Sequence, residues 1–263
     1  MGERFGKLGV VAFLATFLIN AKHAPAGANP AVKNTGDGKH FVALHVNGVC
    51  STSWENGKAP APLGTFSDVE SVSAKVDQTG DMEKATADLR KSLDENCTGN
   101  NWCYVITYSN GGATMSRVLS LFENVWNIVW VYSIASNEGG SEVGGTGWVG
   151  STFGGCKLTG KIGTTDHRAG WNHNDTGGVN FYMTGGNDCM FPYVQCAILP
   201  GEDDGAVAYH SSGGYNDTYS TETLCGNSDN HFHFHEAAFA CDGYDLSHSD
   251  MKKQGICLLG GCN

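Results

Sequence analysis

Residues 106–113 read Ile106-Thr107-Tyr108-Ser109-Asn110-Gly111-Gly112-Ala113, a stretch in which an apolar run meets a serine that small residues follow. The run that leads into it, Trp102–Thr107, predicts a buried strand. The segment after it, Ala113–Phe122, predicts a helix because its apolar residues are spaced three and four apart. A serine on a sharp turn from a strand into a helix presents its hydroxyl as a nucleophile elbow does. Ser109 is therefore the first candidate for a catalytic side chain.

The neighbours of Ser109 match the elbow pattern on one side and depart from it on the other. Small residues are needed two positions before and after the serine, because bulky side chains there collide with the adjacent backbone. Gly111 meets this requirement, whereas Thr107 stands where the usual pattern has glycine. Threonine is still fairly small, so the departure weakens the motif without abolishing it.

Further apolar runs on both sides of this stretch predict more strands. They cover His40–Val46, Val125–Ile134 and Tyr193–Leu199, and the stretch Asp68–Leu93 is expected to be helical. Strands that alternate with helices predict one α/β domain, with a mainly parallel sheet flanked by helices. From Glu138 onward the chain is dense in Gly, Thr, Asn and Trp. We interpret residues 138–190 as an insertion or cap-like region, although a loop-rich insertion with no role in binding fits equally well.

Four tryptophans raise the question of ligand binding. Trp126 and Trp130 lie in an apolar run and are expected in the core. Trp148 and Trp171 lie in the Gly-rich region and are candidates to line a substrate cleft.

The composition of the 263 residues excludes several classes of protein. Hydrophobic residues make up 40%, which is enough for a core and excludes wholesale disorder. The formal net charge of −11 argues against nucleic acid as a partner, because binding to the phosphate backbone needs a basic surface. No G-x-x-x-x-G-K-[ST] phosphate loop occurs, and no cofactor is implied.

The N-terminus has the three parts of a secretory signal. Arg4 and Lys7 precede the uncharged run Leu8–Ile19, and Ala24-Pro-Ala26 or Ala26-Gly-Ala28 offers the small residues of a cleavage site. At about 1.5 Å per residue this run spans about 18 Å, which is too short to cross a bilayer. We expect residues 1–28 to be a cleaved signal peptide, 29–39 a linker and 40–263 the domain. The mature chain is then secreted, or periplasmic in a bacterium, with no stable membrane insertion.

The ten cysteines all lie after the signal segment and fit an oxidising compartment. Up to five disulfides can form, and the spacing does not choose among the pairings. Cys97–Cys103 and Cys257–Cys262 are the closest candidate pairs. A zinc site is less favoured, because no C-x-x-C pair occurs.

If Ser109 is a nucleophile, an acid and then a histidine should follow it along the chain. Asp204 lies in a loop after the predicted strand 193–199, although Asp203 and Glu202 beside it are alternatives. His248 lies in a polar loop near the end of the chain and is the candidate base.

The stretch His231-Phe-His-Phe-His235 offers two other interpretations. His235 is the main rival to His248 as base. Three histidines on one face of a strand, with Glu236 beside them, also resemble a zinc ligand set. Side chains on one face of a strand are about 7 Å apart, however, and converge poorly on one ion. We therefore expect no metal site.

Four segments together resemble secreted lipases and esterases of the α/β-hydrolase fold. Thr107–Gly112 is similar to a T-x-S-x-G-G elbow, and Ser133–Ser141 to a segment often close to T-P-H-x-G-S. Asp204–Val207 is similar to the D-G-x-V stretch that holds the acid, and His248–Met251 to the H-x-D segment that holds the base. The resemblance covers residues 40–252, with motifs of only a few residues each.

The resemblance implies acyl transfer by Ser109, His248 and Asp204, with a lipid, small ester or polyester as substrate. It also implies an oxyanion hole made by the backbone N–H groups of Val49 and Asn110, although Asn47-Gly48 replaces the usual His-Gly. Two alternatives stay open: an amidase or peptidase with the same three residues, and an exported disulfide-rich binding module without catalysis.

Overall fold

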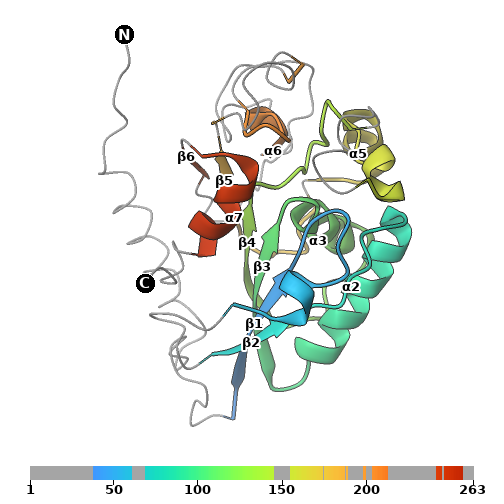
Figure 1. The fold of residues 1–263 in the computed structure, drawn as a ribbon. Helices are drawn as coiled ribbons and strands as arrows, with labels where there is room; N and C mark the ends of the chain where they lie inside the picture. Colours follow the sequence, from blue (N-terminus) through green and yellow to red (C-terminus); the bar gives the residue numbers. More distant parts are fainter. Residues whose placement is uncertain are drawn as a thin grey trace.

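The centre of the molecule is a six-stranded sheet in which all neighbouring strands run parallel (Figure 1). A computed structural model describes residues 38–60, 69–144, 155–173, 175–186, 188, 198–199, 203–212, 241–244 and 246–256. The strands follow the order β2-β1-β3-β4-β5-β6 across the sheet. Their bounds are β1 His40–Val46, β2 Glu70–Ser73, β3 Asn101–Tyr108, β4 Ile128–Ile134, β5 Phe181–Gly186 and β6 Cys241–Tyr244. The prediction of an α/β fold with a mainly parallel sheet is confirmed.

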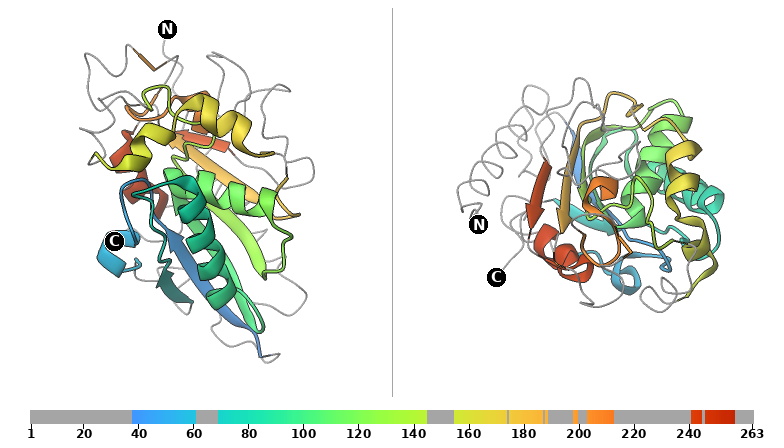
Figure 2. Two further views of the ribbon diagram at one scale, coloured as in Figure 1. Left: turned by 90° about the vertical axis from the view of Figure 1, so that its right-hand side faces the viewer. Right: turned by 90° about the horizontal axis from the view of Figure 1, so that it is seen from above.

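Helices cover both faces of the sheet. Helices α2 (Met82–Asn96) and α3 (Asn110–Leu121) lie side by side on one face, and α7 (His248–Ile256) lies on the other (Figure 2). Shorter helices are η1 (Trp54–Gly57), η3 (Lys157–Lys161), α5 (Thr164–Gly170) and α6 (Tyr209–Ser212). Helices α5 and α6 lie beyond the edge where the strands end, which is the edge that carries functional sites in parallel sheets (Figure 1).

The two faces of the sheet are packed by different residues of the same strands. On the α2 and α3 side, Val42 and Leu44 of β1 pack with Leu89 and Met115 of the helices. On the other side, Phe41 and Ala43 of β1 join the cluster that contains Met251 of α7. A parallel strand buried on both faces reads as a continuous apolar run, which explains why His40–Val46 is recognisable in the sequence.

The segment Asp68–Leu93 is not helical from its start, so that prediction is wrong in its first part. Residues 70–73 form the edge strand β2, and the helix begins only after Asp81. The Asp81 side chain accepts a hydrogen bond from the backbone N–H of Lys84 at 2.8 Å and caps the helix. The strand has only four residues, none of them fully buried, and therefore leaves almost no periodic signal.

The Gly-rich region 138–190 contains a strand of the sheet, which corrects its description as surface elaboration throughout. Residues Phe181–Gly186 form β5, and all six are buried. Strand β6 was also not predicted. Most of the predicted strand Tyr193–Leu199 lies outside the described residues, as do the signal and linker segments 1–28 and 29–37, and the described pair Ile198 and Leu199 is not in a strand.

Two disulfides join described cysteines. Cys97–Cys103 confirms the predicted close pair, and Cys50–Cys156 spans 106 residues of sequence. The candidate pair Cys257–Cys262 lies outside the described residues. An oxidising environment fits both bonds.

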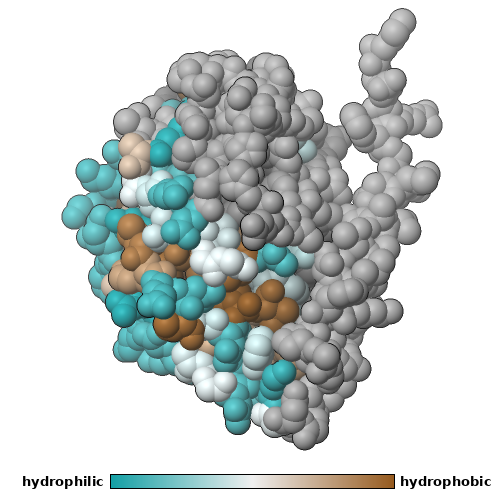
Figure 3. All heavy atoms as spheres, turned by 180° about the vertical axis from the view of Figure 1, so that it is seen from behind, coloured by the Kyte–Doolittle hydropathy of each residue, from teal (hydrophilic) through white to brown (hydrophobic). Residues whose placement is uncertain are grey.

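Apolar residues occur on the surface as small patches among hydrophilic ones, as the face opposite to Figure 1 illustrates (Figure 3). Leu121, Val125 and Ile198 are the large hydrophobic residues exposed within the described segments. In those segments no helix has the length and apolarity needed to span a bilayer. Trp126 and Trp130 are both buried, which confirms their expected place in the core.

Candidate active site

Ser109 sits between β3 and α3 in a conformation that few non-glycine residues adopt. Its φ and ψ are 52° and −130°. Backbone angles of this kind cost about 1–3 kcal/mol and persist only where the surroundings hold them. Here the Ser109 N–H donates to the Ile134 carbonyl at 2.9 Å, and the Ser109 carbonyl accepts from the Gly112 N–H at 3.0 Å. Ser109 is thus in the strained turn that a nucleophile elbow requires.

The residues two positions from Ser109 explain why one glycine is needed and the other is not. A Cβ on Gly111 would lie 2.6 Å from the Val46 carbonyl oxygen, so only glycine fits there. Thr107 instead lies opposite Ser133 of β4, and their hydroxyls are 3.0 Å apart. The departure from the usual motif is accommodated because the threonine hydroxyl has a partner within the sheet.

A chain of hydrogen bonds links Ser109 to a histidine and an aspartate. The Ser109 Oγ is 3.0 Å from Nε2 of His248, and Nδ1 of His248 is 2.7 Å from Oδ2 of Asp204. Because a carboxylate only accepts, Nδ1 carries the proton and the Nε2 lone pair faces the serine hydroxyl. The structure therefore brings together the three residues predicted from separate segments, and we call them the triad.

Each oxygen of the Asp204 carboxylate has its own partners. Oδ2 faces His248, while Oδ1 accepts from the backbone N–H groups of Ala206 at 3.0 Å and Val207 at 2.8 Å. The Asp204 carbonyl also accepts from the His248 N–H at 2.9 Å. The loop of residues 203–207, which we call the acid loop, therefore fixes both the carboxylate and the start of α7.

Asp203, the described alternative to Asp204, does not meet the histidine. Its Oδ1 accepts from the Gly205 N–H at 2.8 Å. Burial, with further contributions from the negative charges of Asp204 and Glu142, raises the pKa of Asp203 to about 6. The other alternative, Glu202, lies outside the described residues, as does the rival base His235.

Tyr108, which the sequence analysis did not single out, contacts His248. Its hydroxyl donates to the His248 carbonyl at 3.1 Å, and the two rings are 5.1 Å apart. Burial, and then the negative charges of Asp204 and Asp250, raise the pKa of Tyr108, so its hydroxyl stays protonated as a donor. Only its position next to Ser109 could have indicated such a role.

The loop after β1 passes directly against Ser109. A Cβ on Gly48, the residue before Val49, would lie 2.6 Å from the Ser109 Cβ. The Val49 N–H has no acceptor among the described residues. Asn110 is the first residue of α3, and N–H groups in the first turn have no partner within a helix. Val49 and Asn110 therefore remain the predicted oxyanion donors, since Val49 follows Gly48, which packs against the serine, and Asn110 follows the serine itself.

His45, two residues before the Asn47-Gly48 pair, is buried in β1. Burial, and then the positive charge of Lys252, lower its pKa to about 3, so the ring is neutral. It packs edge-on against Trp54, with ring centroids 5.2 Å apart. His45 is therefore not the histidine that pairs with Ser109.

A partly buried network links the acid loop to α5. Arg168 donates to Glu142 at 3.1 Å and to the Ser211 hydroxyl at 3.0 Å, and the Ser211 hydroxyl donates to Glu142 at 2.9 Å. The Ser141 hydroxyl donates to the Ala206 carbonyl at 2.6 Å. The predicted insertion thus contributes helix α5 to the support of Asp204.

Trp171, one of the two tryptophans predicted to line a substrate cleft, is buried and contacts helix α3. Its indole N–H donates to the Ser116 hydroxyl at 3.1 Å, and its ring packs against those of His167 and His173. It borders a pocket of about 300 Å³ in which no triad residue takes part. Trp148 lies outside the described residues.

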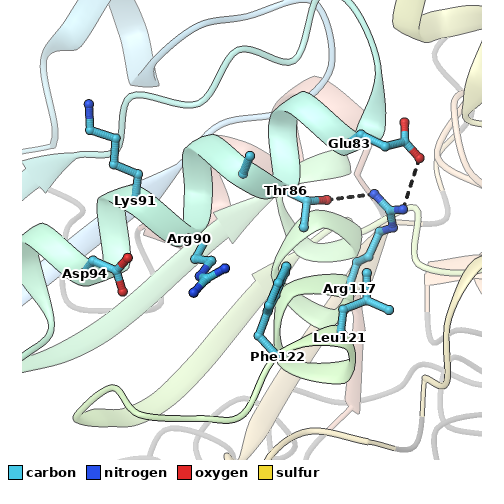
Figure 4. Close-up of a pocket in the computed structure, with 9 residues that line it drawn as sticks. Glu83, Thr86, Arg90, Lys91, Asp94, Arg117, Leu121 and Phe122 are labelled. Atoms are coloured by element: carbon cyan, nitrogen blue, oxygen red, sulfur yellow. Dashed lines mark hydrogen bonds and ion pairs between the residues drawn. The ribbon is translucent and has the colours of Figure 1, made fainter.

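A second pocket, of about 390 Å³, runs between α2 and α3 (Figure 4). Its charged side chains are largely paired: Arg117 donates to Thr86 at 2.9 Å and to Glu83 at 3.1 Å, and Arg90 stacks on Phe122. Within the described segments no three His, Cys, Asp or Glu side chains are grouped to bind a metal ion. The candidate ligands His231–His235 and Glu236 are outside those segments.

Solved structures share the fold of this chain, whereas sequence comparisons find no match. No protein-family model and no curated protein sequence matches the chain. Among solved structures, the mature lipase BlEst2 of Bacillus licheniformis has a TM-score of 0.56 at 15% identity, over 83% of this chain and 91% of its own. The metagenomic carboxyl esterase MGS0156 has a TM-score of 0.56 at 11% identity, over 79% of this chain and 64% of its own. Lipase 1 of Pelosinus fermentans has a TM-score of 0.51 at 10% identity, over 85% of this chain and 99% of its own.

These similarities establish the architecture and leave the chemistry to the site itself. The fold is that of the α/β-hydrolases, and the similar structures are lipases and esterases. Function does not follow from a shared fold, because one fold supports many reactions.

Proposed function

We propose that this protein is a secreted serine hydrolase that cleaves carboxylic esters through an acyl-enzyme intermediate. One observation carries the proposal: the hydrogen-bonded chain from Ser109 through His248 to Asp204, at 3.0 and 2.7 Å. Nucleophile, base and orienting acid in this geometry activate a hydroxyl that is otherwise a weak nucleophile.

The first half of the reaction forms the acyl-enzyme. The Ser109 Oγ attacks the ester carbonyl carbon while Nε2 of His248 takes the hydroxyl proton, and the carbonyl π electrons move onto the oxygen. As the tetrahedral intermediate collapses, the bond to the alcohol oxygen breaks, and His248 returns the proton to that oxygen.

The second half releases the acid by the same steps with water as the nucleophile. His248 takes a proton from water, the hydroxide adds to the acyl carbon, and the Ser109 Oγ leaves with the proton that His248 returns. All atoms balance as ester plus water giving acid plus alcohol. Asp204 accepts the hydrogen bond from Nδ1–H, holds the ring in that tautomer and stabilises the imidazolium that forms in each half.

The oxyanion of both intermediates needs donors that are already in place. We assign this role to the backbone N–H groups of Val49, which follows Gly48 at the serine, and of Asn110, which follows Ser109 at the start of α3. Each such donor is worth about 3 kcal/mol in the transition state. Because both are backbone groups, the replacement of the usual His-Gly by Asn47-Gly48 leaves the donors intact.

Export rests on two observations of different kinds. The sequence of residues 1–28 has the pattern of a cleaved signal peptide. The disulfides Cys50–Cys156 and Cys97–Cys103 fit an oxidising compartment.

Replacement of Ser109 tests the proposal. We expect Ser109→Ala to lose hydrolysis of p-nitrophenyl acetate and butyrate by at least about 10⁴-fold, and to lose covalent labelling by a fluorophosphonate, while its circular dichroism is unchanged. The matched control is Ser92→Ala, which removes a buried serine of α2 and should keep full activity. Equal turnover by Ser109→Ala would reject the assignment.

The same assay separates the ester proposal from its alternatives. A p-nitroanilide with the same acyl group measures amide cleavage, and a faster anilide reaction would make the protein an amidase or peptidase. Neither turnover nor labelling in the wild-type protein would leave a binding module with a hydrolase fold.

A further inference from the structure

A single buried glutamine joins the two chain segments that carry the proposed oxyanion donors. Gln78 is fully buried. Its Nε2 donates to the carbonyl of Asn47, in the loop after β1, and its Oε1 accepts from Nδ2 of Asn110, the first residue of α3, at 2.7 Å. The side chain therefore spans from one donor segment to the other.

The direction of this bridge is fixed by its partners. The Asn47 carbonyl can only accept, so the NH₂ group of Gln78 must face it. The oxygen of Gln78 must then face Asn110, which presents its own NH₂ group. An amide flip at Gln78 would put two acceptors together at one end and two donors together at the other, so only one orientation satisfies both ends.

The backbone of Gln78 also forms hydrogen bonds with the loop after β1. Its N–H donates to the Ser51 carbonyl at 2.8 Å, and its carbonyl accepts from the Cys50 N–H at 2.9 Å. The Cys50–Cys156 disulfide anchors the far end of the loop. Residues 47–51 are therefore held on both sides of Val49, while Val49 itself keeps its N–H free.

Burying a primary amide is costly unless all its strong partners are met. A purely structural position of this size would be filled as well by leucine or methionine, which carry no desolvation cost. The hydrogen bonds of Gln78 instead end on the residue two before Val49 and on Asn110 itself. This placement relates the two donors to each other rather than to the core.

We propose that Gln78 is a positioning residue that sets the separation and direction of the Val49 and Asn110 N–H groups, and thereby the strength of the oxyanion hole. The inference rests on the proposed function. Contacts to an oxyanion exist only in the transition state, so an error in their geometry lowers kcat and leaves substrate binding nearly unchanged.

The first test replaces Gln78 by an apolar residue of similar length. We expect Gln78→Met to lower kcat for p-nitrophenyl butyrate by about 10–100-fold with KM within about threefold, because one misplaced donor costs up to about 10²–10³-fold. The control is Thr86→Val, which removes a buried hydroxyl of α2 that bonds within that helix and to Arg117. It should change kcat by less than about twofold.

A second variant acts on the other end of the bridge and serves if Gln78→Met does not fold. Asn110→Ala removes the side-chain amide and keeps the backbone N–H, so we expect a similar loss in kcat. Both substitutions remove the same Gln78–Asn110 interaction, so their effects should not add. We expect kcat of the double variant Gln78→Met/Asn110→Ala to lie within about threefold of kcat of the slower single variant.

A thionoester substrate distinguishes positioning from general damage. Sulfur is a poor hydrogen-bond acceptor, so a thionoester gains little from the oxyanion hole in any variant. We expect the preference of the wild type for the ester over the thionoester to shrink by about tenfold in Gln78→Met and Asn110→Ala. A loss of activity that is equal for both substrates, or an unchanged kcat in a folded Gln78→Met, would overturn the inference.

These results are separable from a failure of the proposed function. If the wild type neither turns over esters nor reacts with a fluorophosphonate at Ser109, the function is wrong and Gln78 has no oxyanion hole to position. If the wild type does both and the Gln78 variant matches it, only the inference about Gln78 falls.

Discussion

The two halves of the sheet are built differently and carry different parts of the site. Strands β1, β3 and β4 have seven or eight residues and are largely apolar. Strand β1 leads into the loop that contains Val49, and β3 leads into Ser109. Strands β5 and β6 have six and four residues. Asp204 lies near the end of β5, and helix α7, which begins at His248, packs against β5 and β4. The nucleophile thus belongs to a half dominated by packing of bulky side chains, and the acid and base to a half with little strand of its own.

In the second half of the sheet, a glycine at the end of a strand lets neighbouring segments approach closely. Strand β5 ends in Gly185-Gly186, and a Cβ on Gly186 would collide with the Leu246 carbonyl and lie 3.0 Å from the Cβ of Asp204. The absent side chain lets the acid loop and the approach to α7 meet at the end of the strand. Sites assembled from separate segments need such close contacts, whereas a core strand needs the opposite.

The largest effect on kcat is expected from Asp204, the acid carried by the second half of the sheet. Asp204→Asn should lower kcat by about 10³–10⁴-fold, because an amide at this position can favour the wrong histidine tautomer. Asp203→Asn is the matched control, since Asp203 bonds to the Gly205 N–H and not to the histidine, and it should keep kcat within about threefold at pH 8. Both are measured with p-nitrophenyl butyrate. Equal losses in the two variants would mean that the loop as a whole matters, and not the carboxylate on His248.

A smaller effect is expected from filling the space at the end of β5. Gly186→Ala should destabilise the protein by about 1–3 kcal/mol, as overpacking does, and should lower kcat because Asp204 is displaced. Gly160→Ala is the control, since nothing lies within 4 Å of its added Cβ. Urea unfolding and kcat are measured for both. If Gly186→Ala matches Gly160→Ala in both, close approach at this glycine is unimportant.

The smallest effect concerns pH and the buried neighbour of the acid. The pKa of Asp203 is raised from 3.8 to about 6, so the folded state binds its proton more tightly than the unfolded state does. Its contribution to stability is fully present below about pH 4 and is lost as the pH rises to about 6. Asp203→Asn should therefore gain about 1–2 kcal/mol relative to the wild type between pH 4.5 and pH 7.5. Parallel stability curves across this range would contradict the assignment.

The sequence predicted the first half of the sheet better than the second, for a physical reason. Apolar runs at His40–Val46 and Trp102–Thr107 are visible because parallel strands buried on both faces need bulky side chains throughout. Strand β5 reads Phe-Tyr-Met-Thr-Gly-Gly inside a region rich in glycine, and β6 has only four residues, so neither has such a run. Strand β2 was taken for the start of a helix for the same lack of signal.

Some residues of the candidate site were predictable from the sequence and others were not. Ser109, Asp204 and His248 were predicted because a turn after a strand, an acid and a late histidine follow a known order, and the structure brings them within hydrogen-bonding distance. Gln78 and Tyr108 were not predicted, because their roles depend on contacts with residues 31 and 140 positions away. No local pattern marks a side chain whose partners are so distant in the chain.

The Cys50–Cys156 bond has a consequence for the integrity of the chain. It closes a covalent ring that encloses β2, α2, β3, α3 and β4. A protease that cuts once inside this ring leaves two fragments that stay attached, so the nicked protein keeps its mass until a reductant is added. A single cut between Cys50 and Cys156 therefore leaves the protein covalently in one piece for as long as the disulfide is intact.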